Sequence, residues 1–317
     1  MKNNCLMYGK KFLLGIAVLC MLAGITGCSQ KEEKKSEKDP AATAVAKADY
    51  NEDETSNLGQ WARAMGSVLI YLNDGNPYYF GGYQITEDNT AAAGNILSGS
   101  WNIDNRLDLL KQINTLLKTG DRKNYRKEAK EMNAMSKKQL KRAMKQLSGD
   151  LLIHYQMVQY NLENWQDNGL LAWDMCRISH LVQWGYVAGY LNRDEAQALI
   201  EPAAVKLKEH FKNWEEVQNN WLDGFCLFAN VDREAANTDY TNRKALYQKL
   251  LESQDKDNPL YDDSLFTEEI IPVSGTTYQT ILEELNEEEE SSDKQNKKKS
   301  DKKTNSSEKS TATSLVN

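Results

Sequence analysis

The feature that most constrains this fold is an apolar run, LAWDMCRISHLVQWGYVAGYL, at residues 171–191. Read as an α-helix, the run carries apolar side chains at every angle around its axis, which is typical of a helix buried on all sides. A membrane span is the rival interpretation, but it would leave Asp174, Arg177 and His180 in hydrocarbon. The run therefore predicts a buried central helix over about residues 169–191, with other helices packed around it.

Two charged residues lie inside this run, and they decide how it is interpreted. Asp174 and Arg177 are three residues apart, so they share a helix face and can pair. A buried charge without a partner is costly, so the first interpretation is a buried ion pair that ties the helix to its neighbours. The alternative is the floor of a polar pocket, where the planar guanidinium would receive an anionic group. Solvent access to the two side chains separates these possibilities.

The remaining sequence predicts an all-α, mostly helical fold. Segment 106–120 places leucines and isoleucine at helical spacing and ends in Gly120, a common helix stop. Segment 192–211 opens with a capping-box-like pattern and contains Pro202, which should kink or divide it. We expect one compact multi-helix domain at residues 57–284, with PYYFGGYQI as the one place for a hairpin or extended segment.

The first 27 residues have the layout of an export signal. Three lysines precede a short apolar stretch, which is followed by the sequence ITGC, ending at Cys28. ITGC resembles a bacterial lipobox, and this resemblance implies cleavage before Cys28 and a diacylglyceryl group on its thiol. We therefore expect a protein anchored by lipid to the extracytoplasmic side of the cell membrane. An ordinary secretory peptide or an uncleaved anchor is the alternative.

Both flanks of the predicted domain are polar and rich in charge. Residues 28–56 predict a disordered tether, and residues 285–317 predict a disordered tail with an acidic block followed by a basic one. Removing residues 1–27, with three lysines and no acidic residue, would change the formal net charge from −7 to −10. An exported acidic chain of this kind is not a general nucleic-acid binder.

Cysteine and histidine usage argues against metal or thiol chemistry. Cys176 and Cys226 lie in apolar helical patterns and are expected to be buried thiols, although one disulfide bridge is the alternative. His154, His180 and His210 show no paired ligand motif, so no metal and no cofactor are expected. The chain also lacks a G-x-S-x-G elbow and a phosphate-binding glycine loop.

Two segments have the composition of contact surfaces. Residues 121–147 hold ten basic residues and three acidic ones, and could lie on anionic lipid or an anionic wall polymer. A solvated helix face is the plainer interpretation of this segment. In segment 73–85, Tyr78, Tyr79 and Phe80 could form a recognition loop for sugar or peptide, or could pack back on the core.

Three sequence blocks carry a family resemblance. Residues 101–125, 169–196 and 211–224, which include AWDMCR and GYVAGYL, resemble in order and spacing the bacterial family called domain of unknown function 1266. The resemblance covers about residues 100–265 and implies a compact helical domain without an established activity. It also suggests that two of the blocks face each other in one cluster of candidate pocket or ion-pair residues: Trp101, Asp104, Arg106, Trp173, Asp174 and Arg177.

The favoured function is a lipid-anchored binding or interaction module at the cell envelope, attached to the membrane through Cys28. Its partner would be an envelope protein or an anionic polymer. One alternative is an enzyme, such as a hydrolase, with a polar pocket around Asp174 and Arg177. Another is a purely structural envelope protein.

Overall fold

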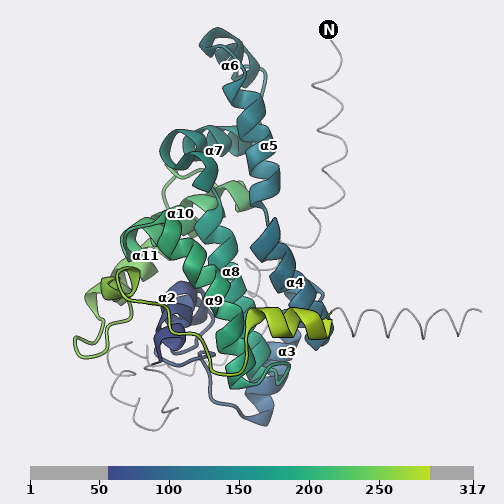
Figure 1. Cartoon of the computed structure of the whole chain (residues 1–317). Coiled ribbons are helices and arrows are strands. Elements are labelled where there is room, and N and C mark those ends of the chain that lie inside the picture. The colour runs from purple at the N-terminus through teal and green to yellow at the C-terminus, as the bar shows by residue number, and fades with distance from the viewer. Residues whose placement is uncertain (1–55, 286–317) are drawn as a thin grey trace, which may run out of the picture.

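A computed structural model describes residues 56–285 of the chain (Figure 1). Within this range the chain forms α-helices and short 3-10 turns and contains no strand, which confirms the predicted all-α fold. The expected signal, Cys28, the tether up to residue 55 and the tail from residue 286 lie outside the described residues.

The helices follow one another with short connections. In chain order they are α2 (Asn57–Leu72), α3 (Glu87–Trp101), α4 (Arg106–Lys118), α5 (Arg122–Asn133), α6 (Lys137–Met144), α7 (Gly149–Trp165), η5 (Gln166–Asn168), α8 (Leu171–Val187), α9 (Arg193–His210), α10 (Trp214–Ala229), α11 (Asp239–Glu252) and η6 (Asp263–Phe266). Residues 278–285 are also helical.

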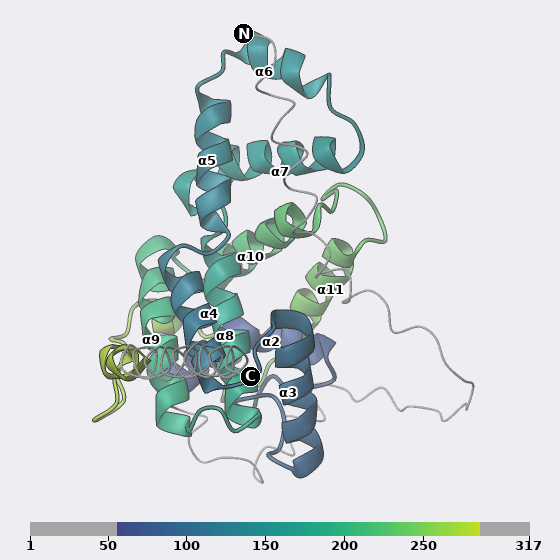
Figure 2. The same ribbon diagram turned by 90° about the vertical axis from the view of Figure 1, so that its right-hand side faces the viewer.

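Helix α8 is the centre of the domain, as its sequence predicted. Helices α2, α3, α4, α9 and α10 all pack against it (Figures 1 and 2). Every side chain from Leu171 to Val187 is buried except Tyr186, which is partly buried. A Cβ atom at Gly185 would lie 2.3 Å from Leu109 Cδ2, so the glycine allows α4 to approach α8 closely.

Side-chain capping boxes fix the starts of α9, as the sequence indicated, and of α6. Asn192 and Glu195 form a capping box at α9, where the Glu195 backbone N–H donates to Asn192 Oδ1 at 3.0 Å. Ser136 and Gln139 form another at α6. Pro202 lies inside α9, which continues to His210 without being divided there.

The connection between α2 and α3 has turns and bends but no strand. Its three aromatic side chains are buried, with exposed fractions of 1% for Tyr78, 6% for Tyr79 and 1% for Phe80. The Gly81 backbone N–H donates to Gln183 Oε1 at 3.0 Å, which fixes the loop to α8. Tyr78, Tyr79 and Phe80 therefore pack into the core, as the second interpretation of this loop expected, and are not exposed for recognition of a sugar or peptide.

Helices α5, α6 and α7 stand away from the rest of the bundle, and we call these three helices the arm. Figures 1 and 2, seen from directions 90° apart, both show α6 at the outer end of this projection. Helix α6 has no buried side chain, whereas α7 packs against α5 and α10. Within residues 56–285, no helix combines the length and the apolar character needed to span a bilayer.

Candidate functional site

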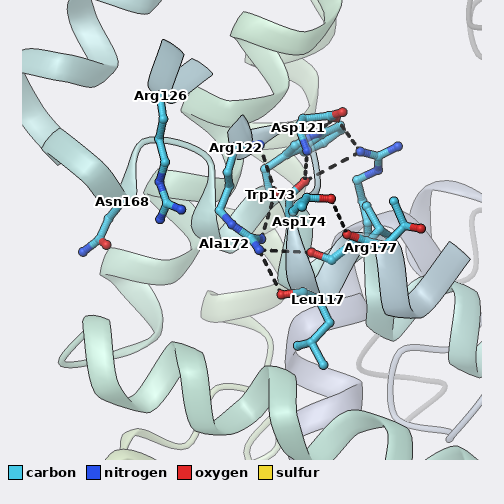
Figure 3. A network of polar contacts seen from close by, with 12 residues as sticks. Leu117, Asp121, Arg122, Arg126, Asn168, Ala172, Trp173, Asp174 and Arg177 are labelled. Carbon is cyan, nitrogen blue, oxygen red and sulfur yellow. Dashed lines mark hydrogen bonds and ion pairs between the residues drawn. The ribbon is translucent and has the colours of Figure 1, made fainter. Parts of the chain in front are cut away.

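The carboxylate of Asp174 is fully enclosed, with 0% of the residue exposed. Its Oδ1 accepts a hydrogen bond from the Asp121 backbone N–H at 3.0 Å. Its Oδ2 accepts from the Arg122 backbone N–H at 3.2 Å and from Arg122 Nη1 at 2.8 Å (Figure 3). Both oxygens are therefore satisfied by the start of α5, where the helix dipole also favours a negative charge.

The turn between α4 and α5 depends on Gly120. This residue has a left-handed φ of 52°, and its N–H donates to the Thr115 carbonyl at 2.9 Å, which ends α4. A Cβ atom at this position would lie 2.1 Å from Asp174 Oδ2. Glycine therefore allows both the turn and the close approach of the next two backbone N–H groups to Asp174.

Arg122 joins three helices through one guanidinium group. While Nη1 binds Asp174 in α8, Nη2 donates to the carbonyls of Leu116 and Leu117, each at 3.1 Å, at the end of α4. The residue is 3% exposed, and burial lowers the pKa of its guanidinium while the charge of Asp174 opposes that change. The arginine thus holds the end of α4 and the start of α5 against α8.

Arg177 lies on the outer side of this cluster. Its Nη1 is 2.6 Å from Asp121 Oδ2 but 3.9 Å from Asp174 Oδ1, so its close partner is Asp121. The expected Asp174–Arg177 pair is therefore a long contact, and Arg122 takes the place that the sequence assigned to Arg177. The reason is geometric, because the α4–α5 turn brings an arginine and two backbone N–H groups directly onto the carboxylate.

Aromatic rings surround the other face of the Arg177 guanidinium. Its central carbon lies 4.6 Å from the ring centre of Trp101, 5.2 Å from Trp173 and 5.1 Å from Phe228. Trp173 Nε1 donates to Asp121 Oδ2 at 3.2 Å, which links the aromatic ring to the ion pair. The Arg177 side chain is 10% exposed, so solvent reaches this group only at an edge.

Burial raises the pKa of Asp174 to about 6, and the negative charge of Asp121 adds to this effect. The positive charges of Arg122 and Arg177 and the Asp121 backbone bond oppose the shift without cancelling it. The two backbone N–H groups and the Arg122 guanidinium that donate to the carboxylate favour its ionised form. Because it is enclosed on all sides, it has no room for a reacting molecule, and the cluster functions as a clamp between helices.

Asp104 and Arg106 make their contacts at a different junction. Arg106 Nη2 forms ion pairs at 2.8 Å with Glu195 in α9 and with Glu284. Asp104 Oδ1 accepts from Ser98 Oγ at 2.6 Å. The structure therefore brings Trp101 and Trp173 to Arg177, and it places Asp104 and Arg106 among the contacts of α3, α4 and α9.

The two cysteine thiols are buried and unpaired. Cys176 and Cys226 are both free, which confirms the expectation of buried thiols over a disulfide. Burial raises the pKa of both thiols, that of Cys226 to about 12. His180 is 1% exposed, and burial together with the charges of Arg243 and Arg177 lowers its pKa to about 3. In the described part of the chain, no three His, Cys, Asp or Glu side chains gather as a metal site would require.

A family model described as a protein of unknown function, DUF1266, matches residues 96–261. This range is more than half of the 317 residues. The chain belongs to the DUF1266 family. The DUF1266 match begins within α3 and ends before η6, so it contains the whole cluster around Asp174. Comparisons with curated proteins and with solved structures found no match.

Asp121 and Arg122, two residues of the cluster around Asp174, were not singled out from the sequence, and Gly120 was noted only as a helix stop. Their signal was present in the stretch KTGDRKNY, where a glycine after an apolar helix is followed at once by an acidic and a basic residue. That pattern alone is common in surface turns. It acquires meaning here because the turn faces a buried aspartate fifty-two residues further along the chain.

Proposed function

We propose that this DUF1266 protein is a binding module held at the outer face of the cell membrane by lipid on Cys28. The lipobox-like sequence before Cys28 supports the anchoring. The module would act by contact through the arm, and the enclosed Asp174 cluster would keep its fold rigid.

The single observation that carries this proposal is the outer surface of the arm. Helix α6 buries no side chain, and its basic residues all face solvent. The exposed basic residues of α6 and its C-cap are Lys137, Lys138, Lys141, Arg142 and Lys145. Because α6 contributes no buried side chain to the core, its outer surface is available for contact with a partner.

The acidic residues near the arm do little to neutralise this surface. Asp121 is paired with Arg177, and Glu128 Oε2 lies 3.0 Å from His154 Nε2. Of the three acidic residues in segment 121–147, this leaves Glu131 exposed without such a pairing. Helix α7 adds exposed Asp150 and Glu163, which are fewer than the basic residues of α6 and its C-cap. A concentrated positive surface on a chain of net charge −7 favours an anionic partner.

The alternative of an enzyme receives no comparable support. Asp174 is 0% exposed, and its oxygens are occupied by the α4–α5 turn. An open hollow of about 440 Å³ lies between α11 and the loop that precedes it, lined in part by Arg233, Tyr240 and Lys244. This hollow is lined by neither Asp174 nor Arg177 and lacks an arrangement of nucleophile and base.

Photocrosslinking in cells tests the proposal. A photoreactive residue at Gln146, exposed just after α6, is compared with one at Asn95, exposed on α3. We expect a reproducible adduct, either protein or lipid, from Gln146 and none from Asn95. No adduct from Gln146, or the same adducts from both positions, would refute contact through the arm and favour a purely structural role.

A further inference from the structure

We infer that the partner of the arm is the surface of an anionic phospholipid bilayer. This inference rests on the proposed function and names its partner. Three observations carry it: the orientation of α6, the apolar residues beside α6, and the charge of the segment.

The two sides of α6 differ in chemistry. Leu140 and Met144, one turn apart, are partly buried and pack towards the hydrophobic core, so they fix that side of the helix inwards. Lys138, Arg142 and Lys145 lie on the opposite side, Lys141 lies at its edge, and all four are exposed. The basic side therefore faces away from the domain, and flat contact by α6 would bring several ammonium groups to one plane.

Two exposed apolar residues lie close to α6 in the sequence. Met135, just before α6, is 38% exposed, and Leu151, in the first turn of α7, is 46% exposed. Five large apolar residues are exposed in the described part of the chain, and two of them are in this short stretch. A soluble polyanion gains nothing from apolar side chains, whereas a bilayer takes lysines at its headgroups and apolar side chains just below. This difference favours the bilayer over an anionic polymer.

The proposed anchor makes a weak surface contact sufficient. A lipid chain and a basic patch are two signals that together give stable membrane attachment. A tether holds the arm at high local concentration near the bilayer, so the arm needs little affinity of its own. Electrostatic attraction acts within about 8 Å at physiological salt, which requires the basic side of α6 to lie directly on the surface.

Hydrogen exchange on the full chain in reconstituted vesicles tests this contact. Vesicles of phosphatidylcholine alone are compared with vesicles in which about 30% of the lipid is anionic phosphatidylglycerol. We expect exchange in segment 133–151 to slow at least tenfold in the anionic vesicles and to recover in high salt, while exchange in α8 stays constant. Comparing the two lipid mixtures removes any effect that attachment of the chain has by itself.

Two matched triple variants assign the effect to the arm. Lys138→Glu, Lys141→Glu and Arg142→Glu together should abolish the protection, because all three positions are exposed on the basic side of α6 or at its edge. Lys118→Glu, Lys212→Glu and Lys256→Glu make the same change in charge at exposed positions outside the arm and should preserve it. Equal loss in both variants would overturn the inference, because the attraction would then come from overall charge.

Other outcomes separate this inference from the proposed function. Protection of segment 133–151 by soluble polyphosphate, with none from anionic vesicles, would replace the bilayer by an anionic polymer and leave contact through the arm standing. The same holds if Gln146 forms a protein adduct in cells while the vesicles give no protection. Absence of an adduct from Gln146 would remove the proposed function itself.

Discussion

Arg122 Nη1 lies 2.8 Å from Asp174 Oδ2, whereas Arg177 Nη1, on the same helix as Asp174, lies 3.9 Å from the other carboxylate oxygen. The pairing across the α4–α5 turn is thus closer than the pairing along α8. Asp174 is fully buried and Arg122 nearly so, whereas Asp121, the close partner of Arg177, has a side chain that is 37% exposed. The two ion pairs therefore differ in how much each stabilises the fold.

Replacing the two arginines separately should reveal this difference. Arg122→Met leaves the Asp174 charge buried without its closest partner, which should cost about 3–5 kcal/mol of unfolding free energy at neutral pH. Arg177→Met leaves a partly exposed Asp121 that water can solvate, so it should cost about 1 kcal/mol. Urea unfolding measures both. Equal costs, or a larger cost for Arg177→Met, would contradict the assignment of Arg122 as the clamp.

Two glycines with left-handed backbones separate close approach from backbone strain. Gly120 and Gly189 have φ values of 52° and 77°, but a Cβ atom meets Asp174 at the first and nothing within 4 Å at the second. Gly189→Ala should cost about 1–2 kcal/mol from its backbone conformation alone. Gly120→Ala should cost about 1–3 kcal/mol more than Gly189→Ala, because the added Cβ atom forces the turn away from the Asp174 carboxylate. Thermal unfolding measures the stability of both variants. Equal losses of stability would mean that the turn can move away from Asp174 without cost.

The sequence predicted the fold better than it predicted the cluster. Periodicity places α8 and its burial directly, since a run that is apolar at every angle has few other solutions. Spacing along one helix also suggested the Asp174–Arg177 pair. What spacing cannot supply is the packing of a distant turn, and it is the turn at Gly120 that brings Arg122 to Asp174.

The loop at Tyr78 to Phe80 illustrates the same limit. Its tyrosines, phenylalanine and glycines suit either an exposed recognition loop or a packed one. The outcome depends on Gln183 in α8, whose side-chain oxygen accepts the Gly81 N–H, and on Tyr186, whose ring contacts Phe80 edge-on. These contacts are between segments about one hundred residues apart and have no local signature.

Acidification should destabilise the protein through His180. Its pKa in the fold is about 3, below its ordinary value of 6.5, so the unfolded chain binds the proton more readily. The stability that neutral His180 provides is complete above about pH 6.5 and is lost as the pH falls towards 3. Between pH 7 and pH 5 this loss is about 2 kcal/mol.

The raised pKa of Asp174 acts in the opposite direction, since the fold gains a proton there as the pH falls below about 6. The test is therefore the difference in unfolding free energy between the wild type and His180→Gln, measured at pH 7 and pH 5. The variant should lose less stability than the wild type over this interval. If the difference in unfolding free energy between wild type and variant does not change with pH, the fold does not lower the pKa of His180, and this prediction is wrong.

Lipid attachment has a direct test at Cys28. Growth with labelled palmitate should label the protein, and Cys28→Ala should abolish the label and release the protein from the membrane fraction. A variant at a buried thiol, Cys226→Ala, provides the matched control and should keep the label. Unchanged labelling of Cys28→Ala would remove the lipobox interpretation and the anchoring that depends on it.

The central claim is that the arm contacts the partner, whereas the cluster around Asp174 and Arg177 stabilises the fold. It is tested most directly by the yield of the adduct from Gln146 in two variant backgrounds. With Arg177→Met the yield should stay within about twofold of the wild type, because a cost near 1 kcal/mol leaves the protein folded. With Lys138→Glu, Lys141→Glu and Arg142→Glu it should fall at least tenfold. The reverse result, an adduct that survives the α6 changes and disappears with Arg177→Met, would move the contact site to Arg177 and contradict the account.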